Sequence, residues 1–166
     1  MTRNDLLAAL DDSPHDLPMT PVIVVGVDDS AGSREALRWA AKQSRVTGLP
    51  LCVLHAWQMN GLAAASTRTT DYTQASAADA RARATRWVRD TLGDDTAEDR
   101  WTLEIVEGAA GPALVSRSRG AGVLVLGITE HPGQRHVIGG SVSRYCLAHA
   151  VPPVVAVPAV ATALVP

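Results

Sequence analysis

A glycine-rich stretch in the last third of the chain holds the residue types that bind phosphate. An apolar run ends at Gly127, a polar loop follows, and Gly140 and Ser141 open a segment with helical spacing. Glycine lets an anion approach the backbone closely, and the free N–H groups at a helix N-terminus attract negative charge. The order of strand, glycine loop and helix therefore predicts that phosphate binds between Gly127 and Ser141.

A second polar group follows the first apolar run, where Asp28, Asp29 and Ser30 stand directly after Val22–Val27. We expect Asp29 or Ser30 to cap the next helix, because these side chains accept hydrogen bonds from free backbone N–H groups. Asp28 is nearer the strand end, where its carboxylate could accept hydrogen bonds from a ribose. A phosphoacceptor site of the response-regulator type is disfavoured, because no aspartate ends the third apolar run and no lysine lies near the fifth.

The chain offers little that could catalyse a reaction. Glu130, His131 and His136 share one loop, where they could bind a metal or act on a small ligand, but such histidines are more often solvated. No dinucleotide fingerprint follows Gly26, the glycine loop has no P-loop lysine, and no serine has the spacing of a nucleophile elbow. We therefore predict a binding protein with no catalytic residues and no metal site, in which any nucleotide hydrolysis would be slow.

Composition and charge limit the class of protein. The chain has 166 residues, of which 46% are hydrophobic and 19% charged, and its net charge is −2. This size and apolar fraction fit one globular domain, and interleaved charges of both signs argue against nucleic acid or a membrane as partner. No apolar run reaches the roughly 20 residues that span a bilayer. We expect a cytoplasmic protein in which Cys52 and Cys146 are small core residues.

Apolar runs alternate with helical segments along most of the chain. The predicted strands are Val22–Val27, Leu51–Trp57, Trp101–Glu107, Val123–Gly127 and Val154–Val157. The predicted helices occupy residues 31–47, 74–93, 112–120 and 141–150. Alternation of this kind predicts a parallel sheet with helices on both faces and a ligand site at the carboxyl ends of the strands. The candidate loops there are Asp28–Ser33, Gln58–Thr73, Gly108–Gly111 and Ile128–Gly140.

Helical periodicity also predicts which side chains face the core. In the first helix these are Ala36, Leu37, Ala40, Ala41 and Ser44. In the second they are Ala78, Ala82, Thr85, Val88 and Leu92. Outside the single domain at 21–158, residues 1–20 are predicted to form an acidic, weakly structured arm and residues 159–166 a tail.

Four segments together resemble the universal stress protein family, over nearly the whole chain. They read VIVVGVDDSAGSREALRWA, LHAW, VEGAAGPALV and LVLGITEHPGQRHVIGGSVSRYCLAHAVPPVVAVP. The resemblance implies an α/β fold of the Rossmann-like, adenine nucleotide alpha-hydrolase-like type, with a five-stranded parallel sheet of order 3-2-1-4-5. It also implies a homodimer formed through the strand Val154–Val157.

The nucleotide-binding branch of the family carries the motif G-x2-G-x9-G-[ST], which here starts at Gly127 and ends at Gly140 and Ser141. The resemblance implies ATP as ligand, with Mg²⁺ as counterion. The residues it implies are Asp28 at the ribose, Leu51 and Leu126 at the adenine, and Gly127, Gly140, Ser141 and Val142 at the phosphates.

The chain departs from this motif at its second glycine, where Glu130 stands instead. A carboxylate 4–6 Å from a phosphate repels it by about 3–4 kcal/mol per unit charge at an effective dielectric of about 20. Arg135, His131 and His136 in the same loop could offset part of this repulsion. Two hypotheses therefore stay open: a regulatory module that binds ATP, and an ATP-independent dimeric interaction protein whose phosphate site is blocked by Glu130.

Overall fold

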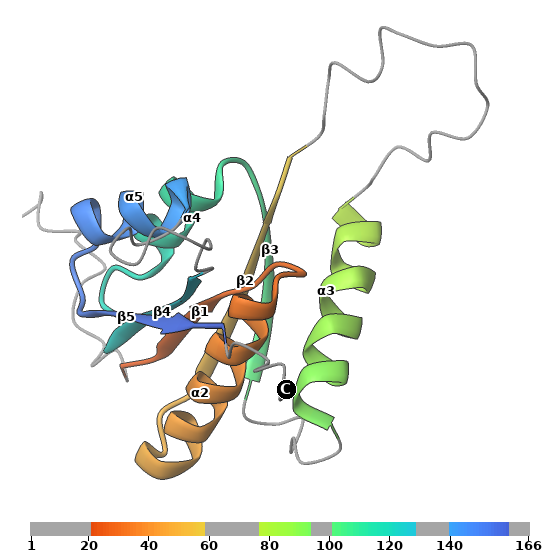
Figure 1. Ribbon diagram of the computed structural model, residues 1–166, viewed down its shortest axis with the longest axis horizontal. Coiled ribbons are helices and arrows are strands. Elements are labelled where there is room, and N and C mark those ends of the chain that lie inside the picture. The colour runs from red at the N-terminus through yellow and green to blue at the C-terminus, as the bar shows by residue number, and fades with distance from the viewer. Residues whose placement is uncertain (1–20, 59–76, 94–100, 129–139, 160–166) are drawn as a thin grey trace, which may run out of the picture.

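The computed structural model describes residues 21–58, 77–93, 101–128 and 140–159. Within these residues five strands form one parallel sheet of order β3-β2-β1-β4-β5 (Figure 1). The strands are β1 (Ile23–Gly26), β2 (Leu51–Trp57), β3 (Trp101–Glu107), β4 (Val123–Ile128) and β5 (Val154–Pro158). The predicted fold class and strand order are confirmed. The predicted N-terminal arm and nearly all of the predicted tail lie outside the described residues.

Helices cover both faces of the sheet, as Figure 1 shows. They are α2 (Ala31–Thr47), α3 (Ala77–Leu92), α4 (Ala110–Arg117) and α5 (Ser141–His149). Side chains of α2 and α3 form one core cluster with alternate residues of the strands, such as Val25 and Val53. Side chains of α4 and α5 form the other cluster with the intervening residues, such as Val24 and Leu54. Both faces of the central strands are buried, which explains their continuous apolar runs.

The first helix forms as its sequence predicts. Ser30 is its N-cap, and the Ser30 hydroxyl accepts a hydrogen bond from the Ser33 N–H at 3.1 Å. Gly48 ends the helix at φ 74°, in the left-handed region that favours glycine. All the side chains predicted to face the core in this helix are buried.

The inward face of α3 differs from the prediction. Its buried residues are Ala80, Ala84, Val88 and Thr91, whereas Ala78 and Ala82 are exposed and Thr85 and Leu92 half-buried. Because the helix consists mainly of alanine and arginine, several stripes at helical spacing are equally apolar. The stripe that packs is the one that brings small alanines against the sheet and α2.

Element boundaries elsewhere agree to within a few residues. β1 is shorter than predicted at both ends, α4 begins two residues earlier than residue 112 and ends at Arg117, and β4 extends to Ile128.

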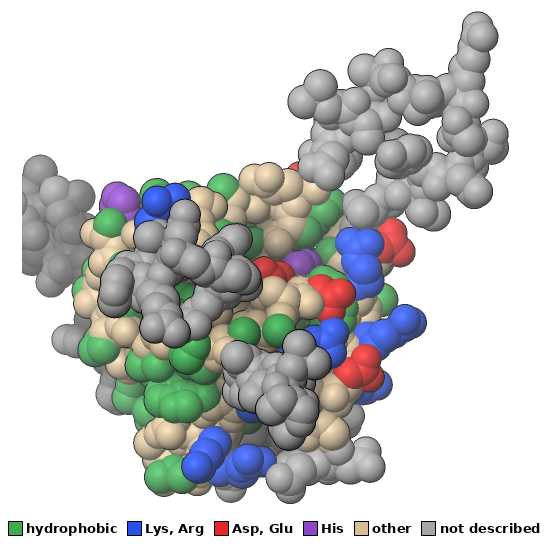
Figure 2. Space-filling view, viewed as in Figure 1, with side chains coloured by type: hydrophobic (Ala, Val, Ile, Leu, Met, Phe, Trp, Pro, Cys, Tyr) green, Lys and Arg blue, Asp and Glu red, His purple; other side chains and the backbone are tan. Residues whose placement is uncertain are grey.

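On the face drawn in Figure 2, basic and acidic side chains are interspersed along the side where α3 lies. None of the described helices is both long and apolar enough to cross a membrane.

Candidate functional site

Two cavities lie at the carboxyl ends of the central strands. The inner cavity has a volume of about 220 Å³ and lies between β1, β4 and the starts of α2 and α5. Its lining includes Val27, Asp28, Ser30, Ser33, Leu126, Gly127 and Val142. The outer cavity has a volume of about 540 Å³ and lies between the starts of α4 and α5. Ala56, Ala110 and Val142 line both, so the cavities adjoin at the point where strand order reverses.

Asp28 is held in place by its neighbours at the start of α2. Its Oδ1 accepts a hydrogen bond from the Ser30 N–H at 2.9 Å, and its own N–H donates to the Ser33 hydroxyl at 2.9 Å. Asp28 is exposed, whereas Ser33 is buried. The carboxylate is therefore oriented at the wall of the inner cavity, where it can accept a hydrogen bond from a ligand.

Close packing of the backbone leaves no room for a side chain at Gly127. A Cβ on Gly127 would lie 2.2 Å from the carbonyl carbon of Gly32 and 2.3 Å from the nitrogen of Ser33. A Cβ on Gly32 would lie 2.8 Å from the carbonyl oxygen of Ile128. The start of α2 thus touches β4 backbone to backbone, which places Ser33 beside the cavity. The first glycine of the sequence motif is required by this contact whatever the ligand.

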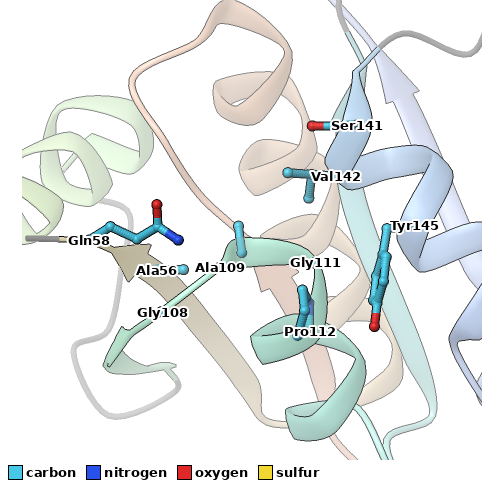
Figure 3. Close-up of a pocket in the computed structure, with 10 residues that line it drawn as sticks. Ala56, Gln58, Gly108, Ala109, Gly111, Pro112, Ser141, Val142 and Tyr145 are labelled. Carbon is cyan, nitrogen blue, oxygen red and sulfur yellow. The ribbon is translucent and has the colours of Figure 1, made fainter. Parts of the chain in front are cut away.

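The starts of α4 and α5 carry no side-chain caps. Gly140 is the N-cap of α5 at φ 90°, and Ala109 is the N-cap of α4. Neither cap makes a side-chain hydrogen bond, and neither first turn contains an acidic residue. Figure 3 shows the start of α4 facing Ser141 and Val142 of α5 across the outer cavity. The N-terminal ends of two helices therefore border one cavity, and helix N-termini attract anions.

Tyr145 forms a wall of the outer cavity through a close fit with α4. A Cβ on Gly111 would lie 2.8 Å from Cδ1 of the Tyr145 ring, so glycine at that position lets the ring approach the helix. The ring also stacks on His149, with ring centroids 4.2 Å apart. Gln58 lines the same cavity from the end of β2 (Figure 3).

Most of the predicted site residues are brought together. Asp28, Leu126 and Gly127 line the inner cavity, Ser141 the outer cavity and Val142 both, and Gly140 precedes Ser141 at the α5 N-cap. Glu130, His131 and His136 lie outside the described residues. Among the residues that the structure does describe, no cluster of histidine, cysteine and acidic side chains could hold a metal ion.

The prediction for Leu51 is wrong. Leu51 is the first residue of β2 and pairs with Ile23 and Trp101 at the amino end of the sheet. Five residues of a strand separate it from Ala56, which is roughly 16 Å. The chain direction in a parallel sheet puts the carboxyl end of β2 at the cavities, so Ala56 and Gln58 are there instead.

Both cysteines are buried and free. Burial raises the pKa of the Cys146 thiol to about 11. Burial, and secondarily the nearby Glu104 carboxylate, raises the pKa of the Cys52 thiol. Both shifts disfavour the thiolate, which is the reactive form of a cysteine. Their packing agrees with the predicted role as core residues.

The sequence matches a model of the universal stress protein family over residues 19–158. The chain belongs to the universal stress protein family. Universal stress protein Rv2623 of Mycobacterium tuberculosis H37Rv is 32% identical over 143 residues, covering 80% of this chain and 46% of that protein. Universal stress protein MT2698 of strain CDC 1551 aligns equally well. The chain therefore spans about half the length of the curated relatives it matches.

Solved structures of the family share the fold. A universal stress protein from Archaeoglobus fulgidus superposes with a TM-score of 0.59 at 25% identity, covering 82% of this chain and 98% of that one. The Archaeoglobus fulgidus protein in complex with dAMP gives a TM-score of 0.55 at 23% identity, with coverages of 82% and 97%. A universal stress protein in complex with cAMP gives 0.54 at 19% identity, with coverages of 84% and 98%.

The residues that sequence reasoning missed come from strand ends and from contacts between distant segments. Ala56 could have been found by counting to the end of the predicted strand instead of its start, whereas Gln58 begins one of the strand-end loops in which a ligand was expected. The contact of Tyr145 with Gly111 joins residues of two helices, and nothing in the local sequence of either helix indicates it.

Proposed function

We propose that this family member binds an adenine nucleotide across the two cavities and acts as a regulatory module. The observation that carries the proposal is the pair of uncapped helix starts, α4 and α5, at one cavity beside the oriented carboxylate of Asp28. A nucleotide contains a ribose, whose hydroxyls donate hydrogen bonds, and a phosphate, which is an anion. The two cavities offer an acceptor and an anion site side by side.

Each part of the nucleotide has a surface of matching chemistry. The ribose hydroxyls would donate to Asp28 at the inner cavity, and the base would pack against Val27 and Leu126. The phosphates would accept hydrogen bonds from the backbone of Ser141 and Val142. No lysine or arginine lines either cavity within the described residues. The helix dipoles and Mg²⁺ would therefore balance the phosphate charge, and a helix terminus contributes about 0.3–1 kcal/mol when exposed.

The solved relatives support a nucleotide as the ligand class, because one was determined with dAMP and another with cAMP. ATP is the nucleotide we propose, since the outer cavity leaves room for more than one phosphate. No general base lines either cavity apart from Asp28, within the part of the chain that is described. We therefore propose a binder instead of an enzyme.

The proposal includes a homodimer formed through β5 and a location in the cytoplasm. β5 is an edge strand whose residues Val154–Val157 are only half-buried, which suits pairing with a second copy in a homodimer. Two buried free cysteines are consistent with the reducing cytoplasm.

The test is a calorimetric titration of MgATP and AMP into the purified protein. We expect a near-stoichiometric response, with MgATP tighter than AMP. Asp28→Asn should weaken MgATP by about tenfold through loss of a charge-assisted hydrogen bond. Asp29→Asn is the matched control, because the neighbouring Asp29 is exposed and paired with Arg34 at 2.5 Å. No binding by folded wild-type protein would overturn the proposal.

The alternative is an interaction protein in which Glu130 occupies the phosphate site. Its support is the open start of α5, which would attract the carboxylate of Glu130 as readily as a phosphate. Glu130→Gly separates the two functions in the same titration. If the wild type binds no nucleotide and the variant does, the blocked-site hypothesis is correct. If both bind equally, Glu130 does not block the site.

A further inference from the structure

His55 lies behind the candidate site, on the sheet face that α2 and α3 cover. The side chain is buried, with 8% of its surface exposed. Its Nδ1 lies 2.9 Å from the carbonyl oxygen of Val27. Because a carbonyl oxygen can only accept, Nδ1 carries the proton and donates it. The hydrogen bond thus crosses from β2 to the residue that immediately precedes Asp28.

Four hydrogen bonds, joined through the covalent frames of the residues between them, connect this imidazole with the Asp28 carboxylate. The carbonyl of Val27 and the N–H of Asp28 belong to one peptide group, and that N–H donates to the Ser33 hydroxyl at 2.9 Å. The Ser33 N–H donates to the Ser30 hydroxyl at 3.1 Å. The Ser30 N–H donates to Asp28 Oδ1 at 2.9 Å. The Ser33 and Ser30 hydroxyls accept these bonds and the backbone N–H groups of the same residues donate the next ones, so each bond fixes the position of the residue that makes the next.

The imidazole is held from the other side by α3. The rings of His55 and Trp87 meet edge to face, with centroids 5.2 Å apart and planes at 83°. Such aromatic pairs contribute beyond the area they bury. Trp87 is half-buried, so a change in how α3 packs would reach the imidazole through this contact.

We propose that His55 is a positioning residue that fixes the Asp28 carboxylate for the ligand, and that α3 acts on the site through Trp87. The proposal rests on the proposed function in taking Asp28 as a ligand contact. The two residues to which it gives a new role, His55 and Trp87, line neither cavity.

The test compares two replacements that both remove the ring. His55→Leu loses the donor, whereas the amide of His55→Asn places an N–H donor where Nδ1 was. We expect His55→Leu to weaken MgATP about tenfold and His55→Asn to restore affinity to within about threefold of wild type. The amide resonances of Asp28 and Ser33 should move in the leucine variant and return toward wild-type positions in the asparagine variant.

Ser44→Ala is the matched control for loss of a buried hydrogen bond. The Ser44 hydroxyl donates to the carbonyl of Leu49 at 2.6 Å, at the far end of α2 from the site. This variant should lower the melting temperature without changing MgATP affinity or the two resonances. Equal affinity losses in His55→Leu and His55→Asn, or an equal loss in Ser44→Ala, would overturn the positioning role.

The experiment separates this proposal from the proposed function. If the wild-type protein binds no MgATP, the proposed function fails, and the Asp28 and Ser33 resonances still decide whether His55 positions them. If His55→Leu does not fold, Trp87→Leu and Trp87→Phe replace it. The leucine variant should then weaken binding about threefold while phenylalanine, which keeps an aromatic face, stays near wild type. Equal affinities in the two variants would contradict the role of α3.

Discussion

The starts of α2 and α5 lie at the same edge of the sheet and are built in opposite ways. The start of α2 is closed by its own sequence, because Ser30 caps it and Asp28 and Ser33 complete a ring of local hydrogen bonds. It is also pressed against the β4 backbone at Gly127. The start of α5 follows Gly140 and has neither a capping side chain nor an acidic residue in its first turn.

Under the proposed function, the difference separates a helix start that is used for structure from one that binds a ligand. Unpaired N–H groups at a helix start need partners, and α2 finds them within the chain. Among the described residues, the starts of α5 and α4 have no capping side chain and border a cavity. We therefore expect an anion at the helix starts whose sequence omits the cap, and this contrast can be tested at each helix.

The largest effect is expected where α2 meets β4. In Gly127→Ala the new Cβ would lie 2.2 Å from backbone atoms that cannot rotate away. We expect a loss of about 3 kcal/mol or more in the free energy of unfolding, since overpacking of this kind displaces backbone. Gly122→Ala, at the opposite end of β4, is the control, because its Cβ would meet nothing closer than 3.4 Å. Similar melting temperatures for the two variants would show that the α2–β4 contact yields easily.

The next effect tests the open start of α5, where Ser141→Asp should change stability and binding in opposite directions. The carboxylate in the first turn should stabilise the helix by about 0.3–1 kcal/mol. The same charge should weaken MgATP by about 10- to 100-fold through repulsion of the phosphates. Ser141→Asn tests shape without charge and should stay close to wild type in both. An aspartate variant with unchanged affinity would mean that phosphate does not approach α5.

Removing the cap of α2, or adding one to α4, should change the free energy of unfolding by a smaller amount. Ser30→Ala should cost about 1 kcal/mol in the free energy of unfolding. Ala109→Ser should gain up to about 1 kcal/mol, because the N-cap of α4 has the extended backbone (φ −69°, ψ 132°) that a capping serine uses. Chemical denaturation of the two variants measures both signs. A loss in Ala109→Ser would contradict the description of α4 as simply uncapped.

Local sequence predicts the closed helix start better than the open one. Ser30, Gly48 and the inward face of α2 follow from capping and periodicity, so that helix agrees with its prediction. The stripe of α3 does not, because alanine and arginine give no contrast in volume along the helix. The hydrogen bond of His55 with Val27 joins β2 to the residue that follows β1, and nothing in the local sequence indicates it.

The candidate site also has a part that the sequence predicts and a part that it does not. The motif predicts Gly127, Gly140 and Ser141 at the carboxyl edge of the sheet, and the structure places them there. A motif does not state why a glycine is needed, and at Gly127 the reason is packing of α2. The prediction for Leu51 was wrong because the resemblance located the strand β2 but did not tell which of its two ends lies at the cavities.

The smallest effect concerns how α4, one of the open helices, is held to the sheet. Its last residue, Arg117, donates to both oxygens of Glu104 on β3 at 2.5 Å. Hydrogen bonding to Arg117 lowers the pKa of the Glu104 carboxyl below its ordinary value of 4.5. A carboxyl whose pKa is lowered by folding adds stability above that ordinary value and loses it as the pH falls through the folded pKa. The pair is partly exposed, so we expect no more than about 1 kcal/mol.

The measurement is urea denaturation of wild type and Glu104→Gln between pH 7 and pH 3. The difference in free energy of unfolding should be constant at neutral pH and shrink below about pH 4.5, where protonation of Glu104 makes the two proteins alike. Arg117→Gln should show the same loss at neutral pH, since it removes the group that lowers the pKa. A difference that persists at pH 3 would mean that packing at Glu104, and not its charge, holds α4.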